Sequence, residues 1–211
     1  MAGKGNYSLV LKEGWLYASV VLLVSLLLQH FAERPWVAAP LWLLAVLLLF
    51  LYRDPTREVP ALPLAVISPA DGRITRVEPA HDPYLDRDAI RISVQMRFWG
   101  IYTTRSPTEG KIVERWTRMP GMQAGDSRRY GIWIQTDESD DVVLVLSHSN
   151  LLQRPQCYVN TGERIGQGQR CGFIRFGAEV EVYVPANSKV NVEAGQAVRA
   201  GVDVIATLVH K

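Results

Sequence analysis

Cysteine and net charge are both scarce in this sequence of 211 residues. Its two cysteines, Cys157 and Cys171, have no second cysteine pair and no histidine close by in the sequence, which is not the pattern of a zinc site. We therefore predict two buried free thiols and no metal. The net charge is only +2, and the basic residues are scattered among acidic ones rather than gathered into a stripe, so no nucleic-acid partner is expected.

Long apolar runs, in contrast, occur twice near the N-terminus. Residues 15–31 read WLYASVVLLVSLLLQHF, and residues 36–52 read WVAAPLWLLAVLLLFLY. A helix of this length spans roughly 25 Å, slightly less than the ~30 Å hydrocarbon core of a bilayer. Two short membrane spans and a re-entrant hairpin both fit. Because the second run follows the first so closely, a cleaved signal peptide alone does not account for them.

Basic residues flank this apolar region unevenly. Lys4 and Lys12 precede the first run and Arg53 and Arg57 follow the second, whereas the linker between the runs contains Arg34 alone. The positive-inside rule therefore places both ends of the hairpin in the cytoplasm. A domain on that side faces a reducing compartment, in agreement with cysteines that need not pair.

The chain divides by composition into a membrane anchor, residues 1–53, and a β-rich domain, residues 54–211. Short apolar or alternating runs, which are typical of strands, recur in the second part and are separated by glycine or proline. The clearest of these runs are residues 90–96, 132–134, 142–146 and 179–184. A mainly β fold is therefore expected after the two-helix hairpin.

The C-terminal segment, residues 190–208, contains short apolar runs around Gly195 and Gly201. This pattern is similar to the half-motif of barrel-sandwich, lipoyl-like folds, so we expect such a part at the C-terminal end of the domain. Lys189 lacks the flanking residues of a modified carrier lysine, and a lipoyl carrier is not expected.

Five short motifs carry a family resemblance, and their order and spacing match across nearly the whole chain. They are YRDPTR at 52–57, SPADG at 68–72, CYV at 157–159, GQR at 168–170 and GFIRFG at 172–177. Together they resemble the short bacterial phosphatidylserine decarboxylases. The resemblance implies an inner-membrane protein of phospholipid metabolism whose partner is a membrane phospholipid.

The same resemblance implies a cofactor that this sequence is not expected to make. In the family, a serine after Phe-Gly attacks the preceding glycine carbonyl, and elimination leaves a pyruvoyl group that forms a Schiff base with the substrate amine. Here Gly177 is followed by Ala178, whose methyl group is neither a nucleophile nor a leaving group. No pyruvoyl cofactor is expected.

Other positions that match the family site show a mixed pattern. Tyr102 stands where the family has a histidine, and tyrosine titrates near 10 rather than near 6.5. Asp71 matches the family aspartate, although the missing chemical partners favour its interpretation as a turn residue before Gly72. Arg105 is either a headgroup contact or a surface cation, and Arg129 is the one residue retained from a second substrate-binding segment.

Four further polar features are not expected to carry chemistry. The acidic residues 137–141 lie between two strand-like runs and suggest a solvated turn. His81 and His148 are expected to be structural or solvated, and Ser188, in a predicted loop, is not expected to replace the missing serine.

Three functions remain open at this stage. The first is a non-catalytic relative that binds a phospholipid headgroup or a partner enzyme, either alone or as a homo-oligomer. The second is an active enzyme that converts phosphatidylserine to phosphatidylethanolamine. The third, a proenzyme trapped by a serine-to-alanine change, would explain Ala178 but not Tyr102.

Overall fold

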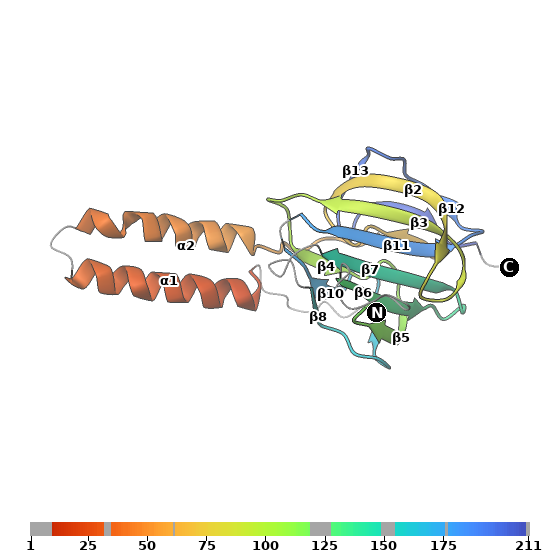
Figure 1. The fold of residues 1–211 in the computed structure, drawn as a ribbon, viewed down its shortest axis with the longest axis horizontal. Coiled ribbons are helices and arrows are strands. Elements are labelled where there is room, and N and C mark those ends of the chain that lie inside the picture. Colours follow the sequence, from red (N-terminus) through yellow and green to blue (C-terminus); the bar gives the residue numbers. More distant parts are fainter. Residues whose placement is uncertain are drawn as a thin grey trace. The chain divides into compact units, whose positions relative to one another are not determined.

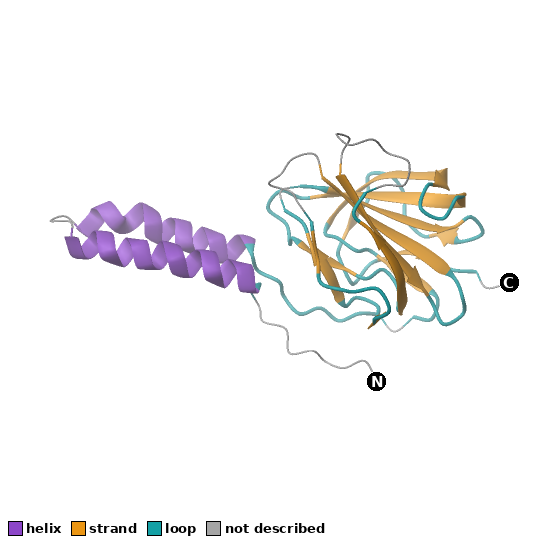
Figure 2. Cartoon of the chain, turned by 60° about the horizontal axis from the view of Figure 1, so that its bottom comes forward, coloured by secondary structure: helices purple, strands orange, loops and turns teal. Residues whose placement is uncertain are grey.

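The computed structural model describes residues 10–31, 35–60, 62–118, 128–148, 155–175 and 177–209. The chain forms two compact units, residues 1–56 and residues 57–211 (Figure 1). The first unit is helical and the second is built from strands (Figure 2).

The first unit is a pair of helices, α1 (Lys12–Phe31) and α2 (Ala39–Leu51), joined through a 3-10 helix, η1 (Pro35–Ala38). Two helices were expected, but α2 begins three residues later than its apolar run. Pro40 lies in its first turn, where a missing N–H costs nothing. Within the described residues, Gly14–Phe31 is the one stretch long and apolar enough to cross a membrane, and α2 is a shorter apolar helix.

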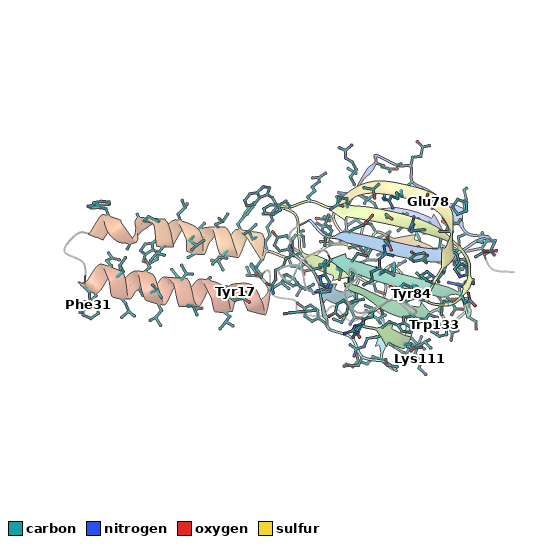
Figure 3. The ribbon with its side chains drawn as sticks, in the orientation of Figure 1. Tyr17, Phe31, Glu78, Tyr84, Lys111 and Trp133 are labelled. Carbon is teal, nitrogen blue, oxygen red and sulfur yellow. The ribbon has the colours of Figure 1, made fainter. Side chains whose placement is uncertain are left out.

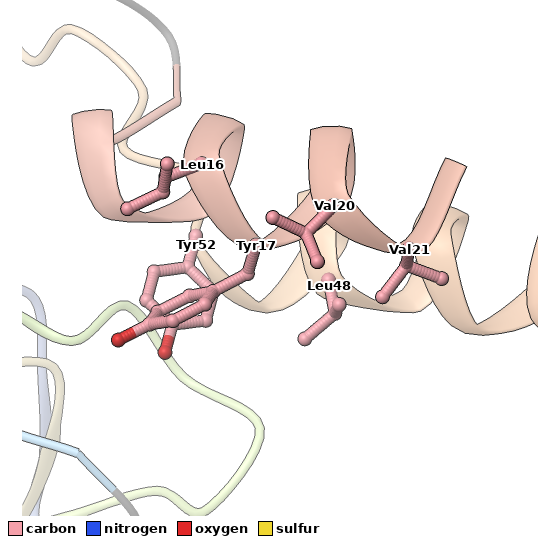
Figure 4. Close-up of a pocket in the computed structure, with 6 residues that line it drawn as sticks. All are labelled: Leu16, Tyr17, Val20, Val21, Leu48 and Tyr52. Carbon is pink, nitrogen blue, oxygen red and sulfur yellow. The ribbon is translucent and has the colours of Figure 1, made fainter. Parts of the chain in front are cut away.

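The two helices pack side by side and leave most of their apolar side chains exposed. Tyr17 and Tyr52 face each other near one end, with ring centroids 5.7 Å apart. An apolar groove runs beside them (Figure 4). It is lined by Leu16, Tyr17, Val20, Val21, Leu48 and Tyr52. Most of the large apolar side chains that are exposed among the described residues belong to these two helices.

The second unit is organised around an eight-stranded antiparallel sheet in the order β13-β2-β3-β11-β7-β6-β5-β9. Its strands are β2 (Gly72–Asp82), β3 (Arg87–Met96), β5 (Gly110–Trp116), β6 (Arg128–Gln135), β7 (Asp141–His148), β9 (Arg164–Ile165), β11 (Glu179–Pro185) and β13 (Ala197–Val198). The four strand-like runs seen in the sequence become β3, β6, β7 and β11, so those predictions are confirmed.

Two three-stranded sheets complete the unit, in the orders β1-β14-β12 and β4-β10-β8. Their strands are β1 (Ala65–Ile67), β4 (Thr103–Arg105), β8 (Gln156–Cys157), β10 (Arg170–Phe173), β12 (Lys189–Val190) and β14 (Val204–Thr207). The C-terminal segment is divided between sheets, because β13 pairs with β2 while β14 pairs with β1 and β12. Its likeness to a lipoyl-like fold stays a prediction.

The main core lies on one face of the large sheet, here called the inner face. Alternation along β3 places Ile92, Val94 and Met96 in this core. The strand β7 is buried on both faces, because Val143 and Val145 pack in a second cluster on the outer face, with Tyr183. Tyr84 and Trp116 extend the outer cluster, and Trp116 stacks on Trp133. Tyr84 and Trp133 are labelled in Figure 3.

The inner core predicts a large cost for truncation at its centre. Replacement of Leu144, which is fully buried in β7, by alanine should lower the free energy of unfolding by about 2–5 kcal/mol. Leu62→Ala, the same truncation at an exposed leucine, should have little effect. Urea unfolding of the full chain in mild detergent, followed by tryptophan fluorescence, measures both. Equal losses would show that burial at Leu144 does not stabilise the fold.

Both cysteines are free thiols, as expected, and Cys171 is buried, but the expectation of burial is wrong for Cys157, which is half-buried. Burial raises the pKa of Cys171 from 9.0 to about 12. Since the thiolate is the nucleophile, Cys171 should resist iodoacetamide at pH 8 until the protein unfolds. Between about pH 9 and pH 12 the unfolded thiol loses a proton that the folded thiol keeps, so stability should fall with rising pH.

The variant Cys157→Ser isolates Cys171 for this measurement by mass spectrometry. Rapid labelling of the native variant at pH 8 would contradict the prediction, whereas labelling only in urea would support it.

Candidate functional site

Three of the residues that the family resemblance singles out, Asp71, Tyr102 and Ala178, gather around the end of β3. The backbone N–H of Met96 donates to the carbonyl of Ala178 over 3.0 Å. The side-chain amide of Gln95 donates to the carbonyl of Gly177. These two bonds fix the Gly177–Ala178 segment, which leads into β11, against its neighbouring strand (Figure 1).

The backbone at Gly177 has φ +67°, a left-handed conformation that glycine adopts without a steric penalty. Ala178 follows with 3% of its surface exposed and packs within the inner core. The side chain at this position is therefore a buried methyl group in an apolar setting.

Tyr102 is 1% exposed, and its hydroxyl donates a hydrogen bond of 2.8 Å to the carbonyl of Phe98. Its ring packs edge-on against Phe173, with centroids 6.0 Å apart. The hydroxyl is thus bonded to the backbone of the segment that follows β3. Tyr102, at the position where the resemblance implies a histidine, therefore holds the segment around Phe98 in place.

Asp71 is held by Arg57 in a two-pronged ion pair, with nitrogen–oxygen distances of 2.5 and 2.7 Å. The backbone N–H of Ala200 donates to the same carboxylate over 2.7 Å, and Arg57 donates to the Ala200 carbonyl over 2.8 Å. The backbone carbonyl of Asp71 accepts a bond from the N–H of Arg97. Asp71 therefore joins the end of β3 to two distant segments.

Arg105 lies beside this cluster and is 5% exposed, so the surface-cation interpretation is wrong. Its guanidinium donates to the carbonyl of Gly168 over 3.1 Å, and its backbone N–H donates to Pro69 over 2.8 Å. The side chain also packs against Gly201, where an added Cβ would lie 2.8 Å from its Cδ. Arg105 is buried because the surrounding loops close over it.

Arg129 lies elsewhere, on the outer face of the large sheet. It forms an ion pair of 3.5 Å with Glu181, a carboxylate that is 1% exposed. Arg91 approaches the same carboxylate at 4.0 Å, and the hydroxyl of Tyr183 donates to it over 3.3 Å. The structure therefore does not bring Arg129 together with Asp71, Tyr102 and Ala178.

The two histidines singled out in the sequence have different surroundings. His148 is buried at the end of β7, with its ring 6.1 Å from that of Tyr130, so it is not solvated. Continuing the Glu179–Ser147 pairing by one residue places His148 opposite Ala178. His81 is exposed and lies 3.1 Å from Asp86.

The other polar candidates serve local structure. Asp137 binds Arg164, and Asp141 accepts a hydrogen bond from the indole of Trp133. Ser188 follows the far end of β11, away from Ala178. No group of three or more ligand-type side chains is placed to hold a metal within the described ranges.

The residue that sequence reasoning missed is Arg57. Its place in the YRDPTR motif was visible, but the motif alone did not show which side chain it binds. Phe98 and Ala200 were also missed, because each contributes a backbone group to the cluster and no side-chain motif indicates such a contact.

Comparisons with known proteins identify the family of the chain. The family model described as phosphatidylserine decarboxylase matches residues 44–206. A protein of Nitrosomonas eutropha named phosphatidylserine decarboxylase proenzyme is 41% identical over 208 residues, covering 95% of each chain. The protein of the same name from Aromatoleum aromaticum is 37% identical and covers 99% of this chain and 100% of its own. No solved structure matches.

The clamp at Asp71 predicts a stability effect that an exposed ion pair would not show. Asp71→Asn should lower the free energy of unfolding by about 1–3 kcal/mol, since it weakens charge-assisted bonds in a mostly buried cluster. The control is Asp137→Asn, which weakens an exposed pair in which one nitrogen of Arg164 contacts both carboxylate oxygens, and it should cost about 0–1 kcal/mol. Chemical denaturation of the full chain compares them; equal costs would mean that the clamp adds nothing.

Proposed function

The chain belongs to the phosphatidylserine decarboxylase family, and we propose that it is a membrane-anchored member that forms no pyruvoyl group and does not decarboxylate phosphatidylserine. Its role in phospholipid metabolism is then to bind a phospholipid headgroup at the cytoplasmic face of the inner membrane. The observation that carries the proposal is the buried methyl group of Ala178 after Gly177.

The residues at this position do not fit a pyruvoyl group. Making one requires a side-chain oxygen that attacks the preceding carbonyl and is then eliminated. The methyl group of Ala178 can do neither, and it packs among apolar side chains of the inner core. We therefore derive no step that uses this cofactor.

One other family position supports the same proposal. The hydroxyl of Tyr102 is bonded to a backbone carbonyl. A catalytic acid or base must have its proton-transfer atoms within reach of the substrate. Here Tyr102 holds a loop in place instead. Arg57 and Asp71 both belong to motifs shared with the family, so their ion pair does not bear on activity.

The helices support the membrane anchor. The length of α1, 20 residues, corresponds to about 30 Å, and η1 with α2 corresponds to about 28 Å, both close to the thickness of a hydrocarbon core. Only 17% of the most apolar stretch of α1 is buried within the structure, so its side chains are available to lipid. The basic residues on either side favour a cytoplasmic domain.

The first test is the covalent state of the purified protein. The full chain should run as one uncleaved polypeptide with no carbonyl-reactive terminus and should release no carbon dioxide from phosphatidylserine in mixed micelles. The Nitrosomonas eutropha proenzyme, prepared in the same host, is the positive control for processing and for decarboxylation.

Two outcomes would overturn the proposal. Cleavage between Gly177 and Ala178 would show that another group makes the cofactor. Decarboxylation by an uncleaved chain would show that the reaction proceeds without it. In either case the active-enzyme interpretation would replace ours.

A further inference from the structure

Two large aromatic side chains stand at the tip of a tight turn beside the candidate site. The N–H of Gly100 donates to the carbonyl of Arg97 over 3.0 Å, which closes a turn over residues 97–100. Its two central residues, Phe98 and Trp99, are 51% and 57% exposed. Such positions usually carry small or polar residues, so an exposed aromatic pair there calls for a partner surface.

The turn is fixed by the residues that match the family site. Its first N–H donates to the carbonyl of Asp71 over 3.3 Å, and the carbonyl of Phe98 accepts the hydroxyl of Tyr102. The Cα of Phe98 would lie 3.9 Å from a Cβ built on Gly177. The aromatic side chains therefore project from a backbone that the site itself holds in place.

A basic side chain accompanies the aromatic pair. Arg97 is exposed at the start of the turn. It forms no ion pair within the part of the chain that the structure describes. The nearby carboxylate of Asp71 is already neutralised by Arg57.

We propose that the turn 97–100 inserts Phe98 and Trp99 into the lipid–water interface, so that the domain docks on the membrane through this turn. Aromatic rings favour the headgroup layer, and arginines are attracted to anionic lipids. Two aromatic side chains offer at most about 500 Å², less than the ~800 Å² per partner of a stable protein interface. A bilayer has no such minimum, because each inserted ring contributes on its own.

The proposal rests on the membrane anchor proposed above, and the chain path agrees with it. Only residues 52–56 separate the end of α2 from Arg57. Arg57 binds Asp71, and Asp71 binds the first residue of the turn. The turn is therefore attached, through two contacts, to the part of the domain that directly follows the helices in the chain.

Fluorine NMR of the full chain in lipid nanodiscs tests the docking directly. The six tryptophans are replaced by 5-fluorotryptophan, and the Trp99 resonance is assigned by its loss in Trp99→Phe. Nanodiscs of phosphatidylcholine with phosphatidylserine carry either a doxyl-labelled lipid, which broadens groups in the bilayer, or a soluble gadolinium chelate, which broadens groups in water.

The half-buried Trp133 on the large sheet is the internal reference. Without membrane contact the more exposed Trp99 should lose more signal to gadolinium than Trp133. Docking reverses that order, and doxyl lipid then broadens Trp99 and spares Trp133. Phe98→Ser should weaken the lipid effect on Trp99, whereas Tyr158→Ser, at an exposed aromatic outside the turn, should leave it unchanged.

The helix tryptophans Trp15, Trp36 and Trp42 report the anchor in the same sample. If they respond to doxyl lipid and Trp99 does not, the docking proposal is overturned and the anchor stands. If none responds, both proposals fail. Protection of Trp99 in native membranes but not in nanodiscs would indicate a protein partner and would overturn the lipid assignment.

Discussion

The ion pair between Arg57 and Asp71 joins three segments that are far apart in the chain. Arg57 begins the strand-built unit, Asp71 precedes β2, and Ala200 lies in the turn between β13 and β14. Each of these three residues is hydrogen-bonded to the other two. Because the backbone of Asp71 also holds Arg97, the position of the aromatic turn follows from this clamp.

If the chain forms no pyruvoyl group, as proposed, the remaining residues of the site still serve the fold. A catalytic group must keep some of its hydrogen-bonding capacity for substrate, and that requirement costs stability. At Asp71 and Tyr102 the capacity is used within the protein. Where no catalytic step occurs, as proposed, such bonds compete with no substrate contact and still stabilise the fold.

The sequence predicted those parts of the fold that depend on local pattern. Alternation identified β3 and β11, and the continuous apolar run of β7 became a strand buried on both faces. The order of the strands could not be predicted, since β11 pairs with β3 and β7 across long stretches of chain. Tyr84, which completes the outer cluster, comes from the connection between β2 and β3, where no periodicity marks it.

The same distinction, between what a local pattern predicts and what depends on tertiary contacts, applies to the site. Family motifs located Asp71, Tyr102 and Ala178, and the structure places all three at the end of β3. The motifs did not show that Arg57 neutralises Asp71, nor that Arg105 is enclosed by the loops around Gly168 and Gly201. Arg57 and Asp71 are 14 residues apart in the chain, and Arg105 and Gly168 are 63 apart, so both contacts depend on the tertiary fold rather than on a local pattern.

The buried carboxylate of Glu181 constrains the register of β11 in the large sheet. Its two arginines come from different strands, Arg91 from β3 and Arg129 from β6, with β7 between β11 and β6. A slip of one residue in β11 would turn Glu181 toward the apolar inner face, away from both. An unpaired buried charge costs several kcal/mol, so a misaligned folding intermediate is disfavoured as soon as these strands meet.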